Sequence, residues 1–352
     1  MGFGAVLGQS RNAGSTPTTS TGKRTTRFSI GTSTNGWTAN DCDYLCDGTD
    51  DQVEINAAIQ ALPSGGGEIV ILDGTYNIGA TIDISIDNVA LSGNGSNTVL
   101  VRQWDAYSGG GATFRFPLIY CDSKCEIINL TINGNNYFNF DNYGIYINLY
   151  KAKCKIEDCF LVNNYCGIYI GGTTSQSSIT PCYFYIMNNY FANNREDIEA
   201  TFDTINGKIL NNFFDHNLLG TNIKSSSIIL NAGGSSSGLY NPHYIIISNN
   251  EFIDGGIYSN CNYIIFSNNI FTEIDGNAIQ INGQYSNIGY YGYNNIIIGN
   301  IIIAKDAQTI LGGISLNNSS QYNLVTNNQL INGATIRNNG TNNTINNNIT
   351  TP

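Results

Sequence analysis

The sequence predicts an all-β solenoid, a parallel β-helix in which short strands stack coil upon coil. The first observation is a recurring phrase, because SNNEF at residues 248–252 returns as SNNIF at residues 267–271. The second is the repeat interval of about 20 to 40 residues, which is typical of solenoids. The third is that no helical period appears after Leu62, so each coil is expected to consist of strands.

The phrase recurs over most of the chain. Further copies are KIEDCF at 155–160, IMNNYF at 186–191, ILNNFF at 209–214, IIGNII at 297–302, VTNNQL at 325–330 and INNNIT at 345–350. An apolar residue stands two places after the second Asn, as at Phe252, and another three places before it, as at Ile247. These two apolar columns predict a continuous core along the solenoid.

The paired Asn residues have two physical uses. One Asn can adopt the left-handed conformation at a tight corner, where its short polar side chain costs little. The other can point inward and hydrogen-bond the Asn of the next coil. The predicted inward ladder consists of Asn189, Asn212, Asn250, Asn269, Asn300 and Asn328.

Composition narrows the class of protein. With 41% hydrophobic and 12% charged residues, the chain can bury a core and is a soluble folded protein. A net charge of -11 disfavours nucleic acid as a partner, because few cations are present to replace the counterions around phosphates. No apolar run near twenty residues and no Sec-type leader are visible, so we expect no membrane insertion and synthesis in a bacterial cytoplasm without a Sec signal.

The nine cysteines lack zinc-finger spacing and are best interpreted as buried thiols in a reduced compartment. Cys125 and Cys154 each stand four residues before aligned corner residues, Asn129 and Asp158. We therefore expect this pair to stack on neighbouring coils at a distance compatible with a disulfide, with the reduced state as the default.

The N-terminal region differs from the repeats. Residues 1–40 are rich in Ser, Thr and Gly and are predicted to form an arm or attachment segment before a β-helix domain at 41–352. Thr49 and Gln52 match a capping box, which predicts a helix over Val53 to Leu62 that ends at Pro63.

Residues 47–78 carry a resemblance to a known superfamily. The shared motifs are Asp47-Gly48, Asp50-Asp51, Ala57-Ala58-Ile59, Gly66-Gly67 and Gly74-Thr75-Tyr76. They resemble the pectate-lyase-like superfamily of right-handed β-helices, which includes phage tailspikes and polygalacturonases. The resemblance implies a single right-handed parallel β-helix whose N-terminal end is capped by residues 47–78. Asp73 departs from the Pro that is common there, and the motif identifies architecture rather than activity.

Irregular insertions enter at one corner, just before the strand that leads to the Asn pair, at 171–185, 231–244 and 283–295. In repeat proteins such an edge is often the binding face, and these insertions are rich in Tyr, which offers a rigid plane and a hydroxyl. Sugar rings suit such planes, and an acidic chain favours neutral or basic glycans. The candidate binding residues are Tyr240, Tyr285, Tyr290, Tyr291 and Tyr293, with Tyr183, Tyr185 and Tyr244 nearby and packing of the insertions as the alternative.

A column of polar residues lies four places after the second Asn: Asn193, His216, Asp254 and Glu273. Coils stack about 4.8 Å apart, so Asp254 and Glu273 could form a carboxylate pair at the separation found in retaining glycosidases. Further candidate catalytic acids are Asp197, Asp215 and Asp275, with Arg195 as a substrate-binding base. The alternative is that Asp and Asn occupy this column because it is a turn.

Cofactor binding is not expected, apart from one conditional case. Arg195, Asp197, Glu199 and Asp203 form an acidic patch with one base, which resembles the calcium sites of lyases of this fold and would hold Ca²⁺ only if the protein is a lyase. A surface ion-pair cluster is the alternative. The polygalacturonase phrases NTD, GHG and RIK are absent from the sequence, so no pectinase residue is carried over.

Three hypotheses for function follow. The first, from resemblance to tailspikes, is a phage or prophage-type virion surface protein that binds cell-surface polysaccharide, attaches to other virion or surface proteins through its arm, and forms a homotrimer. The second is a polysaccharide hydrolase or lyase of the same fold. The third is a structural or decoration protein without catalytic activity.

Overall fold

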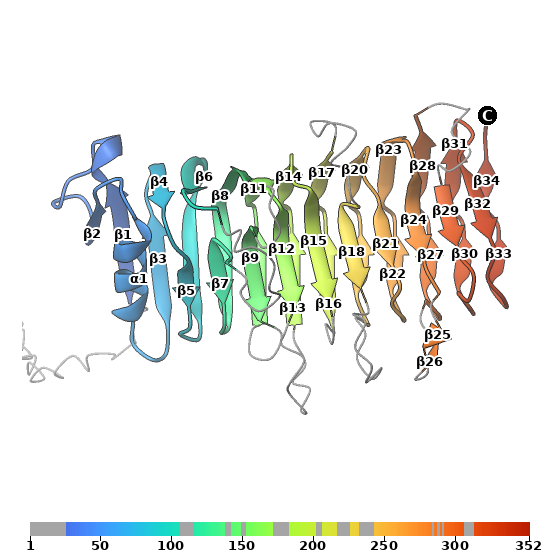
Figure 1. Ribbon diagram of the computed structural model, residues 1–352, viewed down its shortest axis with the longest axis horizontal. Coiled ribbons are helices and arrows are strands. Elements are labelled where there is room, and N and C mark those ends of the chain that lie inside the picture. The colour runs from blue at the N-terminus through green and yellow to red at the C-terminus, as the bar shows by residue number, and fades with distance from the viewer. Residues whose placement is uncertain are drawn as a thin grey trace, which may run out of the picture.

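The computed structural model describes residues 26–105, 116–137, 142–148, 153–171, 183–201, 206–216, 226–231, 243–283, 285–286, 289–290, 292–305 and 313–352. These residues form one solenoid of parallel strands (Figure 1). The predicted right-handed parallel β-helix is thereby confirmed. Tyr240, Tyr291 and Asp203 lie outside the described residues.

Each complete coil contributes three strands, one to each of three faces. The first and second faces together make a 22-stranded sheet, and the third face is a 10-stranded sheet. In one coil, for example, β13 (Tyr183–Met187), β14 (Tyr190–Ala192) and β15 (Glu196–Thr201) follow one another along the chain. Register is kept from coil to coil, since Ile186 on β13 pairs with Ile209 on the next first-face strand.

The strands of the first face are β3 (Gly67–Ile71), β6 (Val89–Arg102), β8 (Cys125–Tyr137), β10 (Lys153–Glu157), β13, β16 (Gly207–Leu210), β19 (Ile246–Ser248), β22 (Ile265–Ser267), β27 (Ile296–Ile298), β30 (Leu324–Thr326) and β33 (Thr344–Asn346). The long strands β6 and β8 continue into the second face. That face also holds β4 (Gly74–Ile78), β11 (Phe160–Asn164), β14, β17 (Phe213–Asp215), β20 (Glu251–Ile253), β23 (Ile270–Ile274), β28 (Ile301–Ala304), β31 (Gln329–Ile331) and β34 (Ile349–Thr350).

The third face consists of β5 (Ile82–Ile84), β7 (Ile119–Cys121), β9 (Tyr143–Asn148), β12 (Cys166–Gly171), β15, β18 (Ile228–Asn231), β21 (Ile257–Ser259), β24 (Asn277–Ile281), β29 (Gly313–Leu316) and β32 (Thr335–Asn338). A short antiparallel hairpin, β25 (Tyr285–Ser286) and β26 (Gly289–Tyr290), projects from the body between the third face of one coil and the first face of the next (Figure 1). The predicted insertions therefore do enter at one corner.

The N-terminal end corrects two predictions. The strand β1 (Arg27–Thr32) pairs with β2 (Tyr44–Cys46) and β3, with the short 3-10 helix Ser33–Asn35 between β1 and β2. Residues 27–40 thus belong to the solenoid body and not to the arm, because Ile30 is fully buried in the core.

The capping helix α1 spans Gln52–Gln60 and closes this end of the core. Its start has no capping box, because the Gln52 side chain accepts a hydrogen bond from Gly79 N at 2.8 Å. Asp51 instead accepts hydrogen bonds from Gly48 N and Asn77 N at 2.8 and 2.7 Å, which ties the helix to β4. Within the described residues α1 is the only α-helix, and no helix there is long and apolar enough to cross a membrane.

The core is built from stacked columns of identical or similar side chains. Phe191, Phe214, Phe252 and Phe271 are fully buried and stack ring on ring, with centroids 4.5 to 4.8 Å apart. This column is the apolar position predicted two residues after the second Asn. Ring stacking between neighbouring coils adds to the free energy of burying each ring.

The predicted Asn ladder occupies the corner between the first and second faces. Asn250 Oδ1 accepts from the backbone N and the side-chain Nδ2 of Asn212, at 2.9 and 3.0 Å, and Asn250 repeats the same two bonds onto Asn269. The ladder residues Asn189, Asn212, Asn250, Asn269, Asn300 and Asn328 are at most 2% exposed. The preceding Asn is left-handed as predicted, at Asn188, Asn211, Asn249, Asn268 and Asn327.

Candidate functional site

An exposed column of side chains runs along the corner where the insertions enter. It stands six residues before each ladder Asn and consists of Tyr183, Asn206, Tyr244, Tyr263, Asn294, Tyr322 and Asn342. From Asn206 onward every member has a left-handed backbone, with φ between 55° and 58°. We call this column the tyrosine strip.

The left-handed backbone makes the Tyr residues of the strip unusual. Asn tolerates this conformation, as at Asn206, Asn294 and Asn342, whereas a bulky side chain there is strained by roughly 1–3 kcal/mol. Tyr244, Tyr263 and Tyr322 nevertheless occupy it and leave 56%, 40% and 58% of their surface exposed. The strain is not offset by burial in the core, so these positions point to a role outside the fold.

The rings of the strip are arranged along the solenoid axis. Tyr244 and Tyr263 stack with centroids 5.4 Å apart, and Tyr263 contacts Tyr293 edge-on at 5.6 Å. Burial raises the pKa of Tyr293, and nearby Tyr263 adds to the effect. A small cavity of about 250 Å³ next to them is lined by Tyr293, Asn294, Gln321 and Tyr322. The result is a run of aromatic planes and hydroxyls across neighbouring coils.

Two of the predicted binding residues are placed only through their backbone. Tyr285 and Tyr290 pair across the β25–β26 hairpin. Tyr293 lies beside the strip and contacts Tyr263. Tyr263 and Tyr322 themselves were missed by the sequence analysis because they stand outside the long insertions. Their signal was present in the register, since both lie six residues before a ladder Asn.

Lysines accompany tyrosines at the N-terminal end of the strip. The register continues from Tyr183 to Lys153, and Tyr185 lies between Lys155 and Lys208 on the neighbouring strands. Lys153 and Lys208 place their ammonium groups 5.4 and 5.7 Å from the ring centroids of Tyr183 and Tyr185. A cavity of about 430 Å³ is lined here by Lys124, Lys153, Lys155, Tyr183, Tyr185, Glu126, Cys125 and Cys154.

The predicted carboxylate column lies at another corner, between the second and third faces. Asn193, Asp254 and Glu273 are all left-handed there, which is the backbone reason for Asp and Asn in a turn. Asp254 follows Ile253, whose register partner is Thr272, so Asp254 and Glu273 hold equivalent places on adjacent coils. Glu273 and Asp275 are exposed and Asp254 is half-buried.

Asp215 belongs to the same region but faces aromatic side chains. It ends β17, in register with Ala192 and Ile253. Burial raises the pKa of Tyr190, with the charge of Asp215 and a hydrogen bond to it as further causes. Tyr190 in turn stacks on Phe213 with centroids 5.4 Å apart on the outside of the second face.

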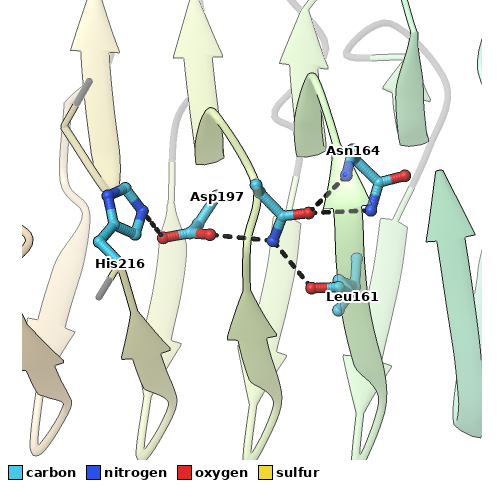
Figure 2. Close-up of polar contacts among 5 residues, drawn as sticks. Leu161, Asn164, Asp197 and His216 are labelled. Carbon is cyan, nitrogen blue, oxygen red and sulfur yellow. Dashed lines mark hydrogen bonds and ion pairs between the residues drawn. The ribbon is translucent and has the colours of Figure 1, made fainter. Parts of the chain in front are cut away.

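Asp197 is in the interior and not on the surface. Its Oδ2 lies 2.6 Å from His216 Nε2, and its Oδ1 accepts from Asn194 Nδ2 at 3.0 Å (Figure 2). Asn194 also bonds Leu161 O and Asn164, so the network spans several coils. Asp197 and His216 are both 0% exposed. A carboxylate that no polymer can reach does not fit the predicted catalytic role, and the network is a second internal ladder.

Of the predicted acidic patch with Arg195, Asp197 is therefore buried, and Asp203 lies outside the described residues. Asp197 points inward, while the exposed Arg195 places its guanidinium 5.1 Å from the ring centroid of Tyr165. Glu196 and Glu199 approach Cys166 instead, with their ligand atoms within 4.8 Å of one another. Binding of Ca²⁺ stays a prediction without a matching set of oxygen ligands among the described residues.

The strip and the carboxylate column do not share a corner. Between Asp254 and Tyr263 the chain runs along β21, so the two features lie at opposite ends of the third face. The outer side of that face carries a second aromatic group, Tyr120, Tyr143, Tyr146, Tyr165 and Tyr169. Four of these rings are at most 7% exposed, so this group packs against its surroundings rather than presenting open planes.

Comparison with known proteins agrees with the fold. No family model and no curated protein matches the sequence. Solved structures do match: an N-terminal fragment of bacteriophage Phi29 gene product 12 aligns with a TM-score of 0.54 at 16% identity, over 86% of this chain and 64% of that one. The A-module of Azotobacter vinelandii mannuronan C-5 epimerase AlgE6 aligns with a TM-score of 0.52 at 17% identity, over 87% and 97%.

A mutant tailspike protein of E. coli bacteriophage HK620, solved in complex with a pentasaccharide, aligns with a TM-score of 0.51 at 14% identity, over 86% of this chain and 63% of that one. The chain thus spans less than two thirds of the length of both phage proteins. At these identities the likeness shows the fold alone, so the chain has the parallel β-helix fold of the HK620 tailspike and of the AlgE6 A-module.

Proposed function

We propose that this protein binds polysaccharide along the tyrosine strip as a component of a phage or prophage-type virion surface. The observation that carries the proposal is the placement of three exposed Tyr residues in a left-handed position that Asn fills on other coils. Backbone strain that burial in the core does not offset is typical of positions whose side chains contact a ligand.

Tyr suits a glycan for physical reasons. Its ring covers the apolar C–H face of a sugar, and its hydroxyl reaches the polar rim. Spacing by coils gives the strip a repeat of about 4.8 Å, so a linear polymer lying parallel to the solenoid axis meets several rings in succession. The HK620 tailspike, which shares this fold, was solved with a bound pentasaccharide, and this supports a glycan as the ligand class.

The lysine end of the strip changes the expected sugar type. Overall charge alone favours neutral or basic glycans, yet Lys124, Lys153 and Lys155 gather at one cavity. Lys155 is paired with Glu157, and the Glu157 hydrogen bond raises the pKa of Lys155. The other two lysines are placed to meet carboxylate or sulfate groups, so we propose a glycan that carries acidic residues.

The test is a binding assay on a panel of neutral and acidic bacterial polysaccharides. Each polymer is measured against the full chain and against the variants Tyr244→Asn and Tyr263→Asn. Both variants install the residue that the fold itself uses at this position, so folding is preserved. We expect one polymer class to bind and each variant to weaken it about tenfold, as expected for loss of one aromatic contact.

Phe160→Thr is the matched control. Phe160 is 36% exposed on the second face, away from the strip, and its register partner one coil earlier is Thr131. Affinity unchanged in Phe160→Thr and reduced in the strip variants supports the proposal. Equal affinity in all proteins, or binding to no polymer, contradicts it.

Assembly is part of the same proposal. We propose a homotrimer attached to other virion or surface proteins through the N-terminal arm, as the resemblance to tailspikes implies. Light scattering on the purified full chain checks the trimer, and a mass of one or two chains contradicts it. A truncation that removes residues 1–25 should leave glycan binding intact and abolish the attachment.

A depolymerase is the second candidate, and one observation favours it: Asp254 and Glu273 hold equivalent places on adjacent coils. We propose that, if the polymer is cleaved, these two carboxylates act as acid and nucleophile. Asp254→Asn keeps a residue suited to the left-handed turn, so it tests chemistry separately from folding. Loss of chain shortening in Asp254→Asn and Glu273→Gln, with binding retained, supports this role. A lyase that needs Ca²⁺ is recognised instead by an unsaturated product and by inhibition with a chelator.

A further inference from the structure

A cluster of three buried thiols converges near the N-terminal end of the solenoid. Cys121 ends β7 on the third face, and Cys125 begins β8 on the first face, four residues later. Cys154 on β10 is the register partner of Cys125, as the stacking prediction required. The Sγ atoms of Cys125 and Cys154 are 3.2 Å apart, and all three sulfurs lie within 4.8 Å of one another.

The two columns that supply these thiols are aliphatic or aromatic on neighbouring coils. Cys121 lies between Ile84 and Ile147 in its column. The column of Cys125 and Cys154 holds Val89 before them and Phe184 after them. Both columns contain Cys at the same level of the solenoid, one on the third face and the other on the first face. Packing alone does not require this coincidence, because larger apolar side chains fill the same columns elsewhere.

We infer that Cys121, Cys125 and Cys154 form a binding site for one soft, thiophilic d¹⁰ cation such as Zn²⁺ or Cu⁺. Thiolate sulfurs are the ligands that these ions prefer. Three sulfurs at about 2.3 Å from one Zn²⁺ lie roughly 3.8 Å apart in a tetrahedral arrangement. That spacing falls inside the span of the trio, so an ion requires only small side-chain movements.

The charges around the trio fit such a site. Three thiolates with one divalent cation carry a net negative charge. Lys124, Lys153 and Lys155 stand next to Cys125 and Cys154 in the sequence and line the same cavity, together with one carboxylate, Glu126. Cationic neighbours favour the thiolate form.

The experiment uses the full chain, reduced and then desalted without oxygen, and Cd²⁺ as the spectroscopic probe. We expect a thiolate-to-cadmium charge-transfer band that saturates at about one equivalent per chain, as for a single site, and that Cu⁺, which also prefers thiolate ligands, displaces. Cys121→Ile and Cys125→Val, which copy the neighbouring residues of each column, should abolish the band. Cys159→Ala and Cys261→Ala, which remove buried thiols outside the trio, should keep it.

A second readout does not depend on the variants folding. In the unaltered protein, Zn²⁺ should protect Cys121, Cys125 and Cys154 from alkylation during partial unfolding, as mapped by mass spectrometry, while the other cysteines react equally with and without the ion. A band that survives in Cys125→Val, protection of other cysteines, or a Cys125–Cys154 disulfide in freshly purified protein overturns the inference.

Discussion

The Asn ladder and the tyrosine strip follow the same repeat, six residues apart in every coil, but the two positions differ in the residue types that occupy them. The ladder position is Asn from Asn189 to Asn328, where each amide satisfies the coil before it and the coil after it. The strip position is Asn on some coils and Tyr on others, and from Asn206 onward the backbone is left-handed in both cases. A ladder position must be Asn because it bonds an Asn on each neighbouring coil. The exposed strip position has the same period but no such constraint, so its side chain can vary and can contact a ligand.

The largest effect is expected from breaking the interior column that the ladder supports. Phe252→Ala removes a fully buried ring between Phe214 and Phe271. We expect the free energy of unfolding to fall by about 3–5 kcal/mol, from lost transfer energy and the cavity left behind. Urea unfolding followed by circular dichroism measures it. Phe160→Ala, on the exposed outer surface, should cost less than about 1 kcal/mol, and equal losses would contradict the assignment of inside and outside.

The second largest loss of stability is expected from removing one Asn of the ladder. Asn250→Ala leaves the backbone N and the Nδ2 of Asn212 without their acceptor. Because buried donors without partners cost about 1–3 kcal/mol, we expect a loss of unfolding free energy in that range. Asn346→Ala is the control, since Asn346 is exposed and lies outside the ladder. A cost at Asn346 as large as at Asn250 would show that the ladder is not a buried network.

The left-handed corner beside the ladder should be less sensitive. Asn249→Ala places a side chain with no local hydrogen bond at φ 57°, which costs roughly 1–2 kcal/mol. Asn249→Gly, which tolerates this conformation, should cost less than Asn249→Ala. Thermal unfolding of the two variants side by side measures the difference. If Gly is as costly as Ala, the Asn249 side chain itself, and not its backbone, is what the corner requires.

Much of this architecture could be predicted from the sequence because the recurring phrase shows which residues of neighbouring coils are equivalent. The two uses of each Asn pair, the apolar columns and the corner of the insertions all follow from spacing. Two exposed Tyr residues of the strip, Tyr263 and Tyr322, were missed because they lie at short corners without an insertion. Counting back six residues from each ladder Asn would have found them.

Other errors arose where the strand alternation of inward and outward side chains fails. Asp197 fits the pattern of a polar turn, but Asp197 and the next residue, Ile198, are both 0% exposed. Asp197 therefore turns inward toward His216. At the N-terminal end, a Ser- and Thr-rich composition concealed β1, since Ile30 is buried within RFSIGT. Side-chain direction at irregular corners cannot be read from spacing.

The smallest expected effect has the opposite sign and bears most directly on function. Tyr263→Asn replaces a strained Tyr with the residue that the fold uses at Asn206 and Asn294, so stability should stay the same or rise by up to about 1 kcal/mol. The reciprocal change, Asn294→Tyr, should lower it by a similar amount. Differential scanning calorimetry on both variants measures the pair. A loss of stability in Tyr263→Asn would mean that the ring stabilises the solenoid, through its contacts with Tyr244 and Tyr293, and would remove the strain argument for a ligand. A gain in stability accompanied by a loss of glycan affinity would show that the strip gives up stability for binding.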